Sequence, residues 1–146
     1  HDGLGALGAK ALLDTVALLE KGEAVRVSQG DSLSTYAAKI TKDDCILDFS
    51  KDARTLHNLI RGLSPIPLSF THTPDGKLLK VIEARINEES TTNDVSGKVI
   101  SLDDGITVAC GRGSITLLRV IPEGKSRMSA EAFVRGRKVN IGDILK

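Results

Sequence analysis

The amino-acid sequence predicts a mainly β fold with α-helices (α+β), built as a small, closed or nearly closed β-barrel that a connector and one N-terminal helix precede. Three observations lead to this prediction. About six short strand-like segments follow one another in the second part of the chain, with turn residues every eight to twelve positions. Two helical segments interrupt them. The first forty or so residues instead show helical spacing followed by a polar stretch.

The first part of the chain predicts a helix and a linker. Residues 2–21 carry apolar side chains at three- and four-residue spacing, which is typical of an amphipathic helix, and Gly22 follows as a stop signal. The residues after it offer this helix no apolar partner, so we expect residues 1–22 to be the end of a truncated upstream domain. Residues 23–41 are polar and turn-rich, which favours an interdomain linker. The barrel domain is then expected over residues 42–146.

The barrel domain is predicted to begin with a strand and a helix. Residues 45–49 alternate between apolar and polar side chains, and a helix is expected from about residue 50 or 51 to residue 63, because Pro65 prevents its continuation. A long strand over 77–86 changes its apolar phase between Val81 and Ile82, which indicates a β-bulge. The other strands are expected at residues 68–73, 97–102, 106–110 and 114–121, with a last short strand at Val139 and Ile141.

The tail of the chain concentrates positive charge around a short helix. Ser129 is a good N-cap for a helix over 130–135, and Gly136 is expected to end that helix in a left-handed conformation. Five cations surround this element: Lys125, Arg127, Arg135, Arg137 and Lys138. Two interpretations stay open on these residues alone, a solvated charged face and a patch that binds an anionic partner.

Charge is unevenly distributed along the 146 residues, although the formal net charge is only +1. Residues 1–104 contain 12 Lys and Arg against 16 Asp and Glu, whereas residues 105–146 contain 8 against 3. An asymmetry of this kind favours a polyanionic partner for the second segment, and it also occurs on ordinary charged surfaces. No apolar run is long enough to span a membrane.

The sequence offers no set of residues that would make an active site. It has no glycine-rich phosphate loop before a lysine, no Cys and His cluster at metal-ligand spacing and no nucleophile elbow. Cys45 and Cys110 lie in strand-like segments and are interpreted as buried hydrophobic residues, which points to a cytoplasmic protein. His57 and His72 are given no role. We therefore predict no catalytic residue and no metal site in this chain.

Four segments together resemble the C-terminal part of the methionyl-tRNA formyltransferase family. Residues 2–20 are similar to the helix that closes the family's catalytic domain, and residues 35–42 (TYAAKITK) to its interdomain T-Y-A-x-K-I/L-x-K segment. Residues 46–49 with 60–67 are similar to I-D-W and I-R-A-x-x-P-x-P, and residues 122–136 to P-x-G-K-x-x-M-S-A-x-x-F. The order and spacing of the segments carry the resemblance more than any one of them.

This chain departs from the family pattern at a few positions. Phe49 stands where Trp is usual, Gly62 where Ala is usual, and Leu68 and Ser69 where the family often has Gly and Ala. These substitutions change side-chain size in a core and a turn, so they concern packing more than identity.

The resemblance implies an enzyme that transfers a formyl group from 10-formyltetrahydrofolate to the methionyl amino group of initiator tRNA. It also implies that the catalytic Asn, His and Asp lie in an upstream domain in cis, since this chain has neither Asn-x-His nor Ser-Leu-Leu-Pro. We therefore expect this chain to bind no cofactor itself. The family's C-terminal domain is an open barrel of the oligonucleotide-binding type, and it contacts initiator methionyl-tRNA. A cytoplasmic monomer without membrane contact is expected.

The candidate tRNA contacts combine the linker lysines that match the family motif with the tail cations. They are Lys39, Lys42, Lys125, Arg127, Arg135, Arg137 and Lys138, with Arg112 and Arg119 as weaker candidates. The three phenylalanines lie in apolar rows, which argues against a platform for stacking single-stranded bases. Met128 is interpreted as a packing residue at the end of the barrel in preference to a recognition residue.

Two alternatives to this function remain. The chain is also compatible with the C-terminal domain of another folate-dependent formyltransferase or hydrolase, although a small substrate held elsewhere gives no reason for the basic tail. A barrel that only stabilises its catalytic neighbour is the other alternative, and it predicts no tRNA affinity for the isolated chain.

Overall fold

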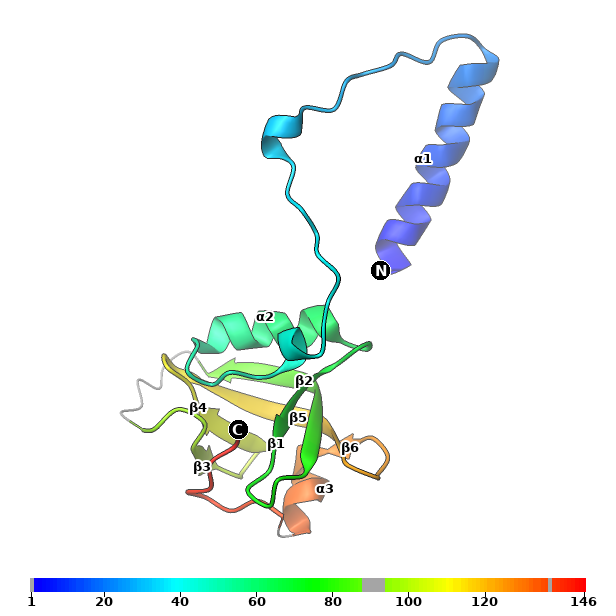
Figure 1. The fold of residues 1–146 in the computed structure, drawn as a ribbon. Helices are drawn as coiled ribbons and strands as arrows, with labels where there is room; N and C mark the ends of the chain where they lie inside the picture. Colours follow the sequence, from blue (N-terminus) through cyan, green and yellow to red (C-terminus); the bar gives the residue numbers. More distant parts are fainter. Residues whose placement is uncertain (1, 88–93, 137) are drawn as a thin grey trace. The chain divides into compact units, whose positions relative to one another are not determined.

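The computed structural model describes residues 2–87, 94–136 and 138–146, which form two compact units, His1–Ala38 and Lys39–Lys146 (Figure 1). The first unit contains the helix α1 (Asp2–Glu20) and a short 3-10 helix, η1 (Asp31–Leu33), in an otherwise extended segment. α1 confirms the helix predicted over 2–21. Its apolar side chains are exposed. None of the helices among the described residues combines the length and the apolar character that crossing a lipid bilayer requires.

The second unit is built on a curled antiparallel sheet (Figure 1). Its strands lie in the order β1-β2-β5-β4-β3, and β6 pairs with β5. The strands are β1 (Ser69–His72), β2 (Leu78–Asn87), β3 (Val99–Ser101), β4 (Ile106–Ala109), β5 (Ser114–Pro122) and β6 (Met128–Ser129). The mainly β, barrel-like α+β domain predicted from the sequence is therefore confirmed, and β6 is a strand that the sequence pattern did not indicate.

A β-bulge bends β2 where the sequence predicted one. The register of β2 against β5 shifts between Val81 and Glu83 and again between Glu83 and Ala84. Both Val81 and Ala84 are buried, so the extra residue restores the inward phase of the strand after the shift. The bulge thus explains the change of apolar phase after Val81, and it lets one long strand follow the curl of the sheet.

Two helices lie on opposite sides of the curled sheet (Figure 1). α2 (Ala53–Leu63) begins later than predicted, because the carboxylate of Asp52 accepts a hydrogen bond from the amide of Thr55 and so caps the helix. α3 (Ala130–Arg135) has the predicted N-cap, since the hydroxyl of Ser129 accepts a hydrogen bond from the amide of Ala132. Apolar side chains of both helices join the inward-facing residues of the sheet in one core.

The end of α3 differs from the prediction. Gly136 has φ −76°, which is not the left-handed conformation expected of it. Its amide donates to the carbonyl oxygens of Phe133 and Val134, so the last turn is closed by ordinary backbone hydrogen bonds. A glycine after a helix thus permits a left-handed cap, but the helix can end without one.

The segment predicted as a strand over 45–49 does not form a strand. Cys45 closes a 3-10 helix, η2 (Asp43–Cys45), and Ile46 makes only an isolated bridge with Phe70 of β1. The predicted alternation is nevertheless present, since Cys45, Leu47 and Phe49 are buried while the residues between them are exposed. Leu47 donates one backbone hydrogen bond to Phe70 (2.9 Å).

Residues 142–146 join the two edges of the sheet. On one side the amide of Leu145 donates to the carbonyl of Gly97, which precedes β3, at 2.9 Å. On the other side His72 of β1 and Lys146 exchange backbone hydrogen bonds of 2.7 and 3.1 Å. The last short strand predicted at Val139 and Ile141 is therefore wrong, because the pairing lies a few residues later along the chain.

Candidate nucleic-acid interface

Lys125 and Arg127 lie in the loop between β5 and β6. The amide of Lys125 donates to the carbonyl of Pro122 (3.0 Å), which closes a tight turn, and Gly124 within that turn has φ +68°. Lys125 ends this turn, Arg127 lies two residues beyond it, and both are exposed. The sequence P-E-G-K thus forms a tight turn that presents positive charge.

The cations after α3 are placed by its last turn. Arg135 lies 4.0 Å from the carboxylate of Glu131, one turn earlier, and both side chains are largely exposed. Such a pair contributes little to stability, so Arg135 remains accessible to an anion. Lys138 is exposed. Arg137 lies outside the residues that the structure describes.

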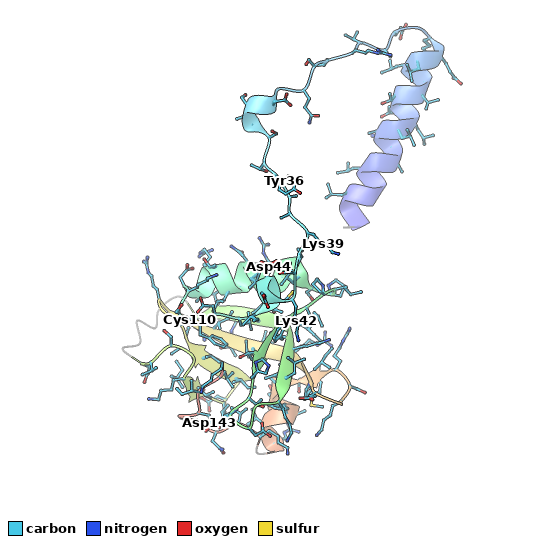
Figure 2. All side chains as sticks on the ribbon, viewed as in Figure 1. Tyr36, Lys39, Lys42, Asp44, Cys110 and Asp143 are labelled. Carbon is cyan, nitrogen blue, oxygen red and sulfur yellow. The ribbon has the colours of Figure 1, made fainter. Side chains whose placement is uncertain are left out.

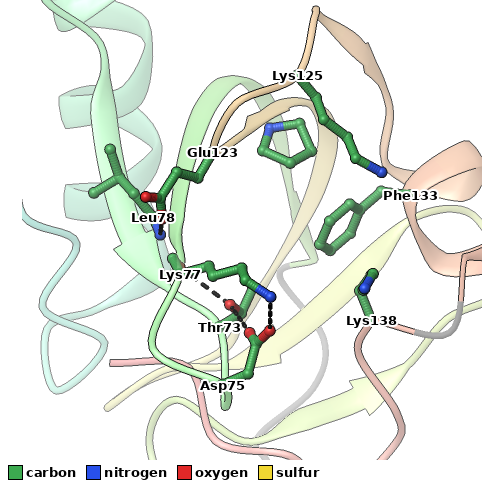
Figure 3. Close-up of a pocket in the computed structure, with 9 residues that line it drawn as sticks. Thr73, Asp75, Lys77, Leu78, Glu123, Lys125, Phe133 and Lys138 are labelled. Atoms are coloured by element: carbon green, nitrogen blue, oxygen red, sulfur yellow. Dashed lines mark hydrogen bonds and ion pairs between the residues drawn. The ribbon is translucent and has the colours of Figure 1, made fainter.

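A hollow of about 150 Å³ brings two of the predicted tail cations together (Figure 3). Lys125 and Lys138 lie at its rim, and the ring of Phe133 lies between them. We call this hollow the tail hollow, and its other lining residues are Thr73, Asp75, Lys77, Leu78, Pro122 and Glu123. It therefore combines an apolar floor with three ammonium groups and two carboxylates.

The charges inside the tail hollow are partly paired. The ammonium of Lys77 donates to the carboxylate of Asp75 at 2.7 Å, and with a hydrogen bond from Thr73 this lowers the pKa of Asp75 to about 2. The same contact raises the pKa of Lys77. Within the described part of the chain, Lys125 and Lys138 make no ion pair. These two are therefore the least neutralised of the three lysines in the hollow.

The linker lysines lie at the start of the second unit (Figure 2). Lys39 is exposed, and the ammonium of Lys42 lies 5.9 Å from the centroid of the Phe70 ring, which is a cation–π distance. Asp44, two residues after Lys42, accepts hydrogen bonds from the amide and the hydroxyl of Thr41. These bonds lower the pKa of Asp44 and direct its carboxylate toward Thr41.

A second hollow, here called the linker hollow, has Lys42 and Lys80 among its lining residues. Phe70 and Leu78 line it too, together with Ile40, Thr41, Cys45, Pro67 and Leu68. The structure thus places Lys42 in one hollow and Lys125 and Lys138 in the other. Lys39, Arg127 and Arg135 line neither of them.

Sequence reasoning missed Lys77 and Lys80, which line these hollows. The two lysines flank Leu78 and Leu79 in the sequence, and the predicted strand over 77–86 was interpreted only for its apolar phase. That phase does carry a signal for Lys80, because a residue that alternates with the buried Leu79 and Val81 points outward. It does not place Lys77, and it does not show which other residues lie beside either lysine.

The weaker candidates lie apart from the two hollows. Arg112 is in the turn between β4 and β5, where it lines a separate hollow with Asp52 and Asn87. Arg119 of β5 lies 4.0 Å from the carboxylate of Glu83. Neither arginine lines the tail hollow or the linker hollow.

The described residues hold no group of side chains suited to binding a metal ion. Among them, no three His, Cys, Asp or Glu side chains gather in a way that could hold a metal ion. Cys45 and Cys110 are buried free thiols, as predicted, and burial raises the pKa of Cys110 to about 11. A thiol with such a pKa is protonated at neutral pH and is a poor nucleophile. The cationic hollows are therefore the best candidate functional surface.

A model of a known protein family matches this barrel. The family model described as "Formyl transferase, C-terminal domain" matches residues 39–138, which is most of the second unit. The chain belongs to this family. Membership agrees with the resemblance seen in the sequence, and the matched region begins where the second unit begins.

Curated relatives named methionyl-tRNA formyltransferase align with nearly all of the chain. The protein from Geotalea daltonii is 41% identical over 97% of this chain, and the one from Symbiobacterium thermophilum is 39% identical over 97%. The relative from Clostridium novyi is 35% identical over the whole chain. The chain spans 45%, 44% and 47% of the length of these three relatives, respectively.

Solved structures share the fold of this family member. A crystal structure of HypX from Aquifex aeolicus superposes with a TM-score of 0.66 at 17% sequence identity, covering 88% of this chain and 22% of HypX. Another HypX structure, described as a complex with tetrahydrofolic acid, superposes with a TM-score of 0.65. At this identity the likeness concerns the fold alone.

Proposed function

We propose that this chain is the tRNA-binding portion of a methionyl-tRNA formyltransferase. In this proposal the whole enzyme moves a formyl group from 10-formyltetrahydrofolate to the methionyl amino group of initiator tRNA at the start of translation. The observation that carries the proposal is the alignment of relatives with that name over 97% or more of the chain. The catalytic residues and the formyl donor belong to an upstream domain in cis, for which residues 1–22 form the last helix and residues 23–41 the linker.

The charge and shape of the second unit support RNA as the partner. Among the described residues, the side chains of Lys39, Lys42, Lys125, Arg127, Arg135 and Lys138 are exposed. Phosphates are bound by such ammonium and guanidinium groups without any demand on base sequence. The rings of Phe49, Phe70 and Phe133 are each at most 6% exposed, so they offer no stacking surface to bases. Recognition of the tRNA backbone is the mode that fits these residues.

The proposal assigns no catalytic residue, metal or cofactor to the chain itself. It gives Lys39, Lys42, Lys125, Arg127, Arg135, Arg137 and Lys138 the role of phosphate contacts. It also makes the protein a cytoplasmic monomer, in which the barrel contributes affinity for the tRNA while the upstream domain contributes the chemistry.

The test is a binding titration of the whole chain with initiator tRNA transcript at several salt concentrations, followed by fluorescence anisotropy. If four to six cations contact phosphates, the affinity falls by about a hundredfold or more between 50 and 200 mM salt, because each contact releases a bound counterion. A flat salt response would overturn the proposal.

Absence of binding at low salt would favour the alternative of a barrel that only stabilises its catalytic neighbour. A variant of the chain with Lys125, Arg135 and Lys138 all changed to Gln separates the two functions. Loss of affinity with unchanged thermal stability supports the RNA interface, whereas loss of stability alone supports the structural role.

A further inference from the structure

The two hollows that hold the predicted cations share one residue. Leu78 lines both the tail hollow and the linker hollow, so the two are neighbours on the surface of β2. Lys42 and Lys125 are far apart in the sequence, and the fold brings their hollows side by side through the start of this strand.

The register of β1 and β2 explains which residues lie between the hollows. Phe70 pairs with Lys80, and Leu79 and Val81 on either side of Lys80 are fully buried in the main core. Lys80 and Leu78 therefore point to the outer face of the sheet, and Phe70 lies on that same face. The outer face of the β1-β2 pair thus carries Lys80 in the linker hollow, two residues from Leu78, which both hollows share.

A small apolar cluster packs on this outer face. Phe70 packs with Cys45 and Leu63, and half-buried Leu78 packs against them. The thiol of Cys45 donates to the carbonyl of Thr41 (3.3 Å), which ties the segment that carries Lys42 to the cluster. The ring of Phe70 in turn lies under the ammonium of Lys42. The contact with Phe70 therefore positions the Lys42 ammonium, while the register of β2 opposite Phe70 places Lys80 on the same face.

We propose that Lys77 and Lys80 connect the linker and tail cations into one continuous phosphate-binding surface for the tRNA backbone. We call it the lysine track, and its members are Lys42, Lys80, Lys77, Lys125 and Lys138. The proposal rests on the proposed function, and it adds two contact residues and the path that the backbone follows from the linker hollow to the tail hollow.

The acidic groups along the lysine track are already engaged. The carboxylate of Glu123 accepts a hydrogen bond from the amide of Leu78 (3.0 Å), and that of Asp75 accepts from Lys77. These two carboxylates reduce the positive charge at the tail end of the lysine track. Lys80 and Lys42 make no ion pair among the described residues. Lysine ammonium groups that lie free of carboxylates can neutralise the phosphates of a nucleic-acid backbone.

The decisive variant is Lys80→Gln, measured in the whole chain by anisotropy with initiator tRNA transcript over a salt series. The affinity is expected to fall about three- to tenfold at 0.1 M salt, and the salt slope to lose about 0.7 to 0.9, which is the effect of one phosphate contact. Lys80→Arg keeps the charge and is expected to retain most of the affinity. Lys51→Gln, an exposed lysine that lines neither hollow, is the matched control and is expected to change neither quantity.

The outcomes separate this inference from the proposed function. If Lys80→Gln leaves affinity and slope unchanged while Lys125→Gln lowers both, the tRNA contacts the tail alone and the lysine track is overturned, although tRNA binding stands. If Lys80→Gln and Lys51→Gln lower the affinity equally, the effect is one of net charge and the track is likewise overturned. Equal melting temperatures of the variants show that folding does not account for the difference.

Discussion

At the scale of single residues, Asp75 limits how much positive charge the tail hollow presents. Its carboxylate lies 2.7 Å from the ammonium of Lys77 and keeps a pKa of about 2, so it is ionised at neutral pH and neutralises that lysine. A phosphate that approaches Lys77 has to compete with this carboxylate. Under the proposed function, Asp75 therefore reduces the positive charge that the tail hollow offers to a phosphate.

Asp75→Asn is therefore expected to strengthen tRNA binding. The amide keeps the shape of the side chain and removes its charge, which frees Lys77 for a phosphate and steepens the salt slope by up to about 0.9. Anisotropy titrations with initiator tRNA transcript at several salt concentrations measure both effects. Asp143→Asn, at an acid that does not line the tail hollow, serves as the control. Weaker binding by Asp75→Asn would show that the carboxylate positions Lys77 for its contact.

Met128 is a residue for which packing outweighs recognition. Its backbone pairs with Val120 in the β5-β6 ladder, and its half-buried side chain packs against the main core. Met128→Ala is expected to lower the free energy of unfolding by about 1 to 2 kcal/mol, below the range for fully buried methionines, while tRNA affinity per folded molecule stays the same. Thermal melting and anisotropy measure the two quantities. A variant that melts normally and binds tRNA weakly would make Met128 a contact residue.

At the scale of elements, two glycines show how local geometry decides a substitution. Gly62 lies in α2 with open space around its missing Cβ, and the family usually has Ala there. Gly111, in the turn between β4 and β5, would place a Cβ in a clash with the carbonyl oxygen of Ser50. Its amide also donates to the carbonyls of Phe49 and Lys51, which ties this turn to the segment before α2.

The same change from Gly to Ala is expected to have opposite effects at these two positions. Gly62→Ala should raise the free energy of unfolding by about 0.5 to 1 kcal/mol, because alanine favours the helix. Gly111→Ala should lower it by about 3 kcal/mol, because the backbone of residues 50 and 51 has to move away. Urea denaturation of the two variants and the unchanged chain provides the comparison. Equal effects of the two substitutions would contradict this description of the turn.

The elements that the sequence predicted well are those whose evidence is local. Alternation located β2 and its bulge at Val81, and helical spacing located α1 and α2. The errors concern which segments pair as strands and where and how the helices begin and end. Residues 45–49 alternate as a strand does, yet they make only one bridge, and nothing in their own pattern could show how many partners the fold would supply.

The charged residues of the candidate site that belong to a sequence motif could be predicted from the sequence. The P-E-G-K turn and the capped helix that follows it were visible in the sequence, and so were the linker lysines. Lys77 and Lys80 were not, because their role depends on the register that places Phe70 opposite Lys80 and on the packing of Cys45 over that face. Long-range register is not encoded in the periodicity of a single strand.

At the scale of the whole molecule, the barrel is closed by residues 142–146 and not by the strand predicted at Val139 and Ile141. Leu145 is 2% exposed and belongs to the main core, and its amide bonds to Gly97 beside β3. Ile141, which the alternation had placed in a strand, is 65% exposed. The two residues thus differ in environment although both are large aliphatic side chains near the end of the chain.

Truncating these two side chains measures how much the closure of the barrel contributes to the free energy of unfolding. Leu145→Ala is expected to lower the free energy of unfolding by about 2 to 4 kcal/mol, because it leaves a cavity where the two edges of the sheet meet. Ile141→Ala is expected to change it by less than about 0.5 kcal/mol, since the side chain is largely solvated. Urea denaturation followed by far-UV circular dichroism gives both values. A larger loss at Ile141 than at Leu145 would mean that the barrel closes through the earlier segment, and hydrogen exchange at the amide of Leu145 would then be fast instead of protected.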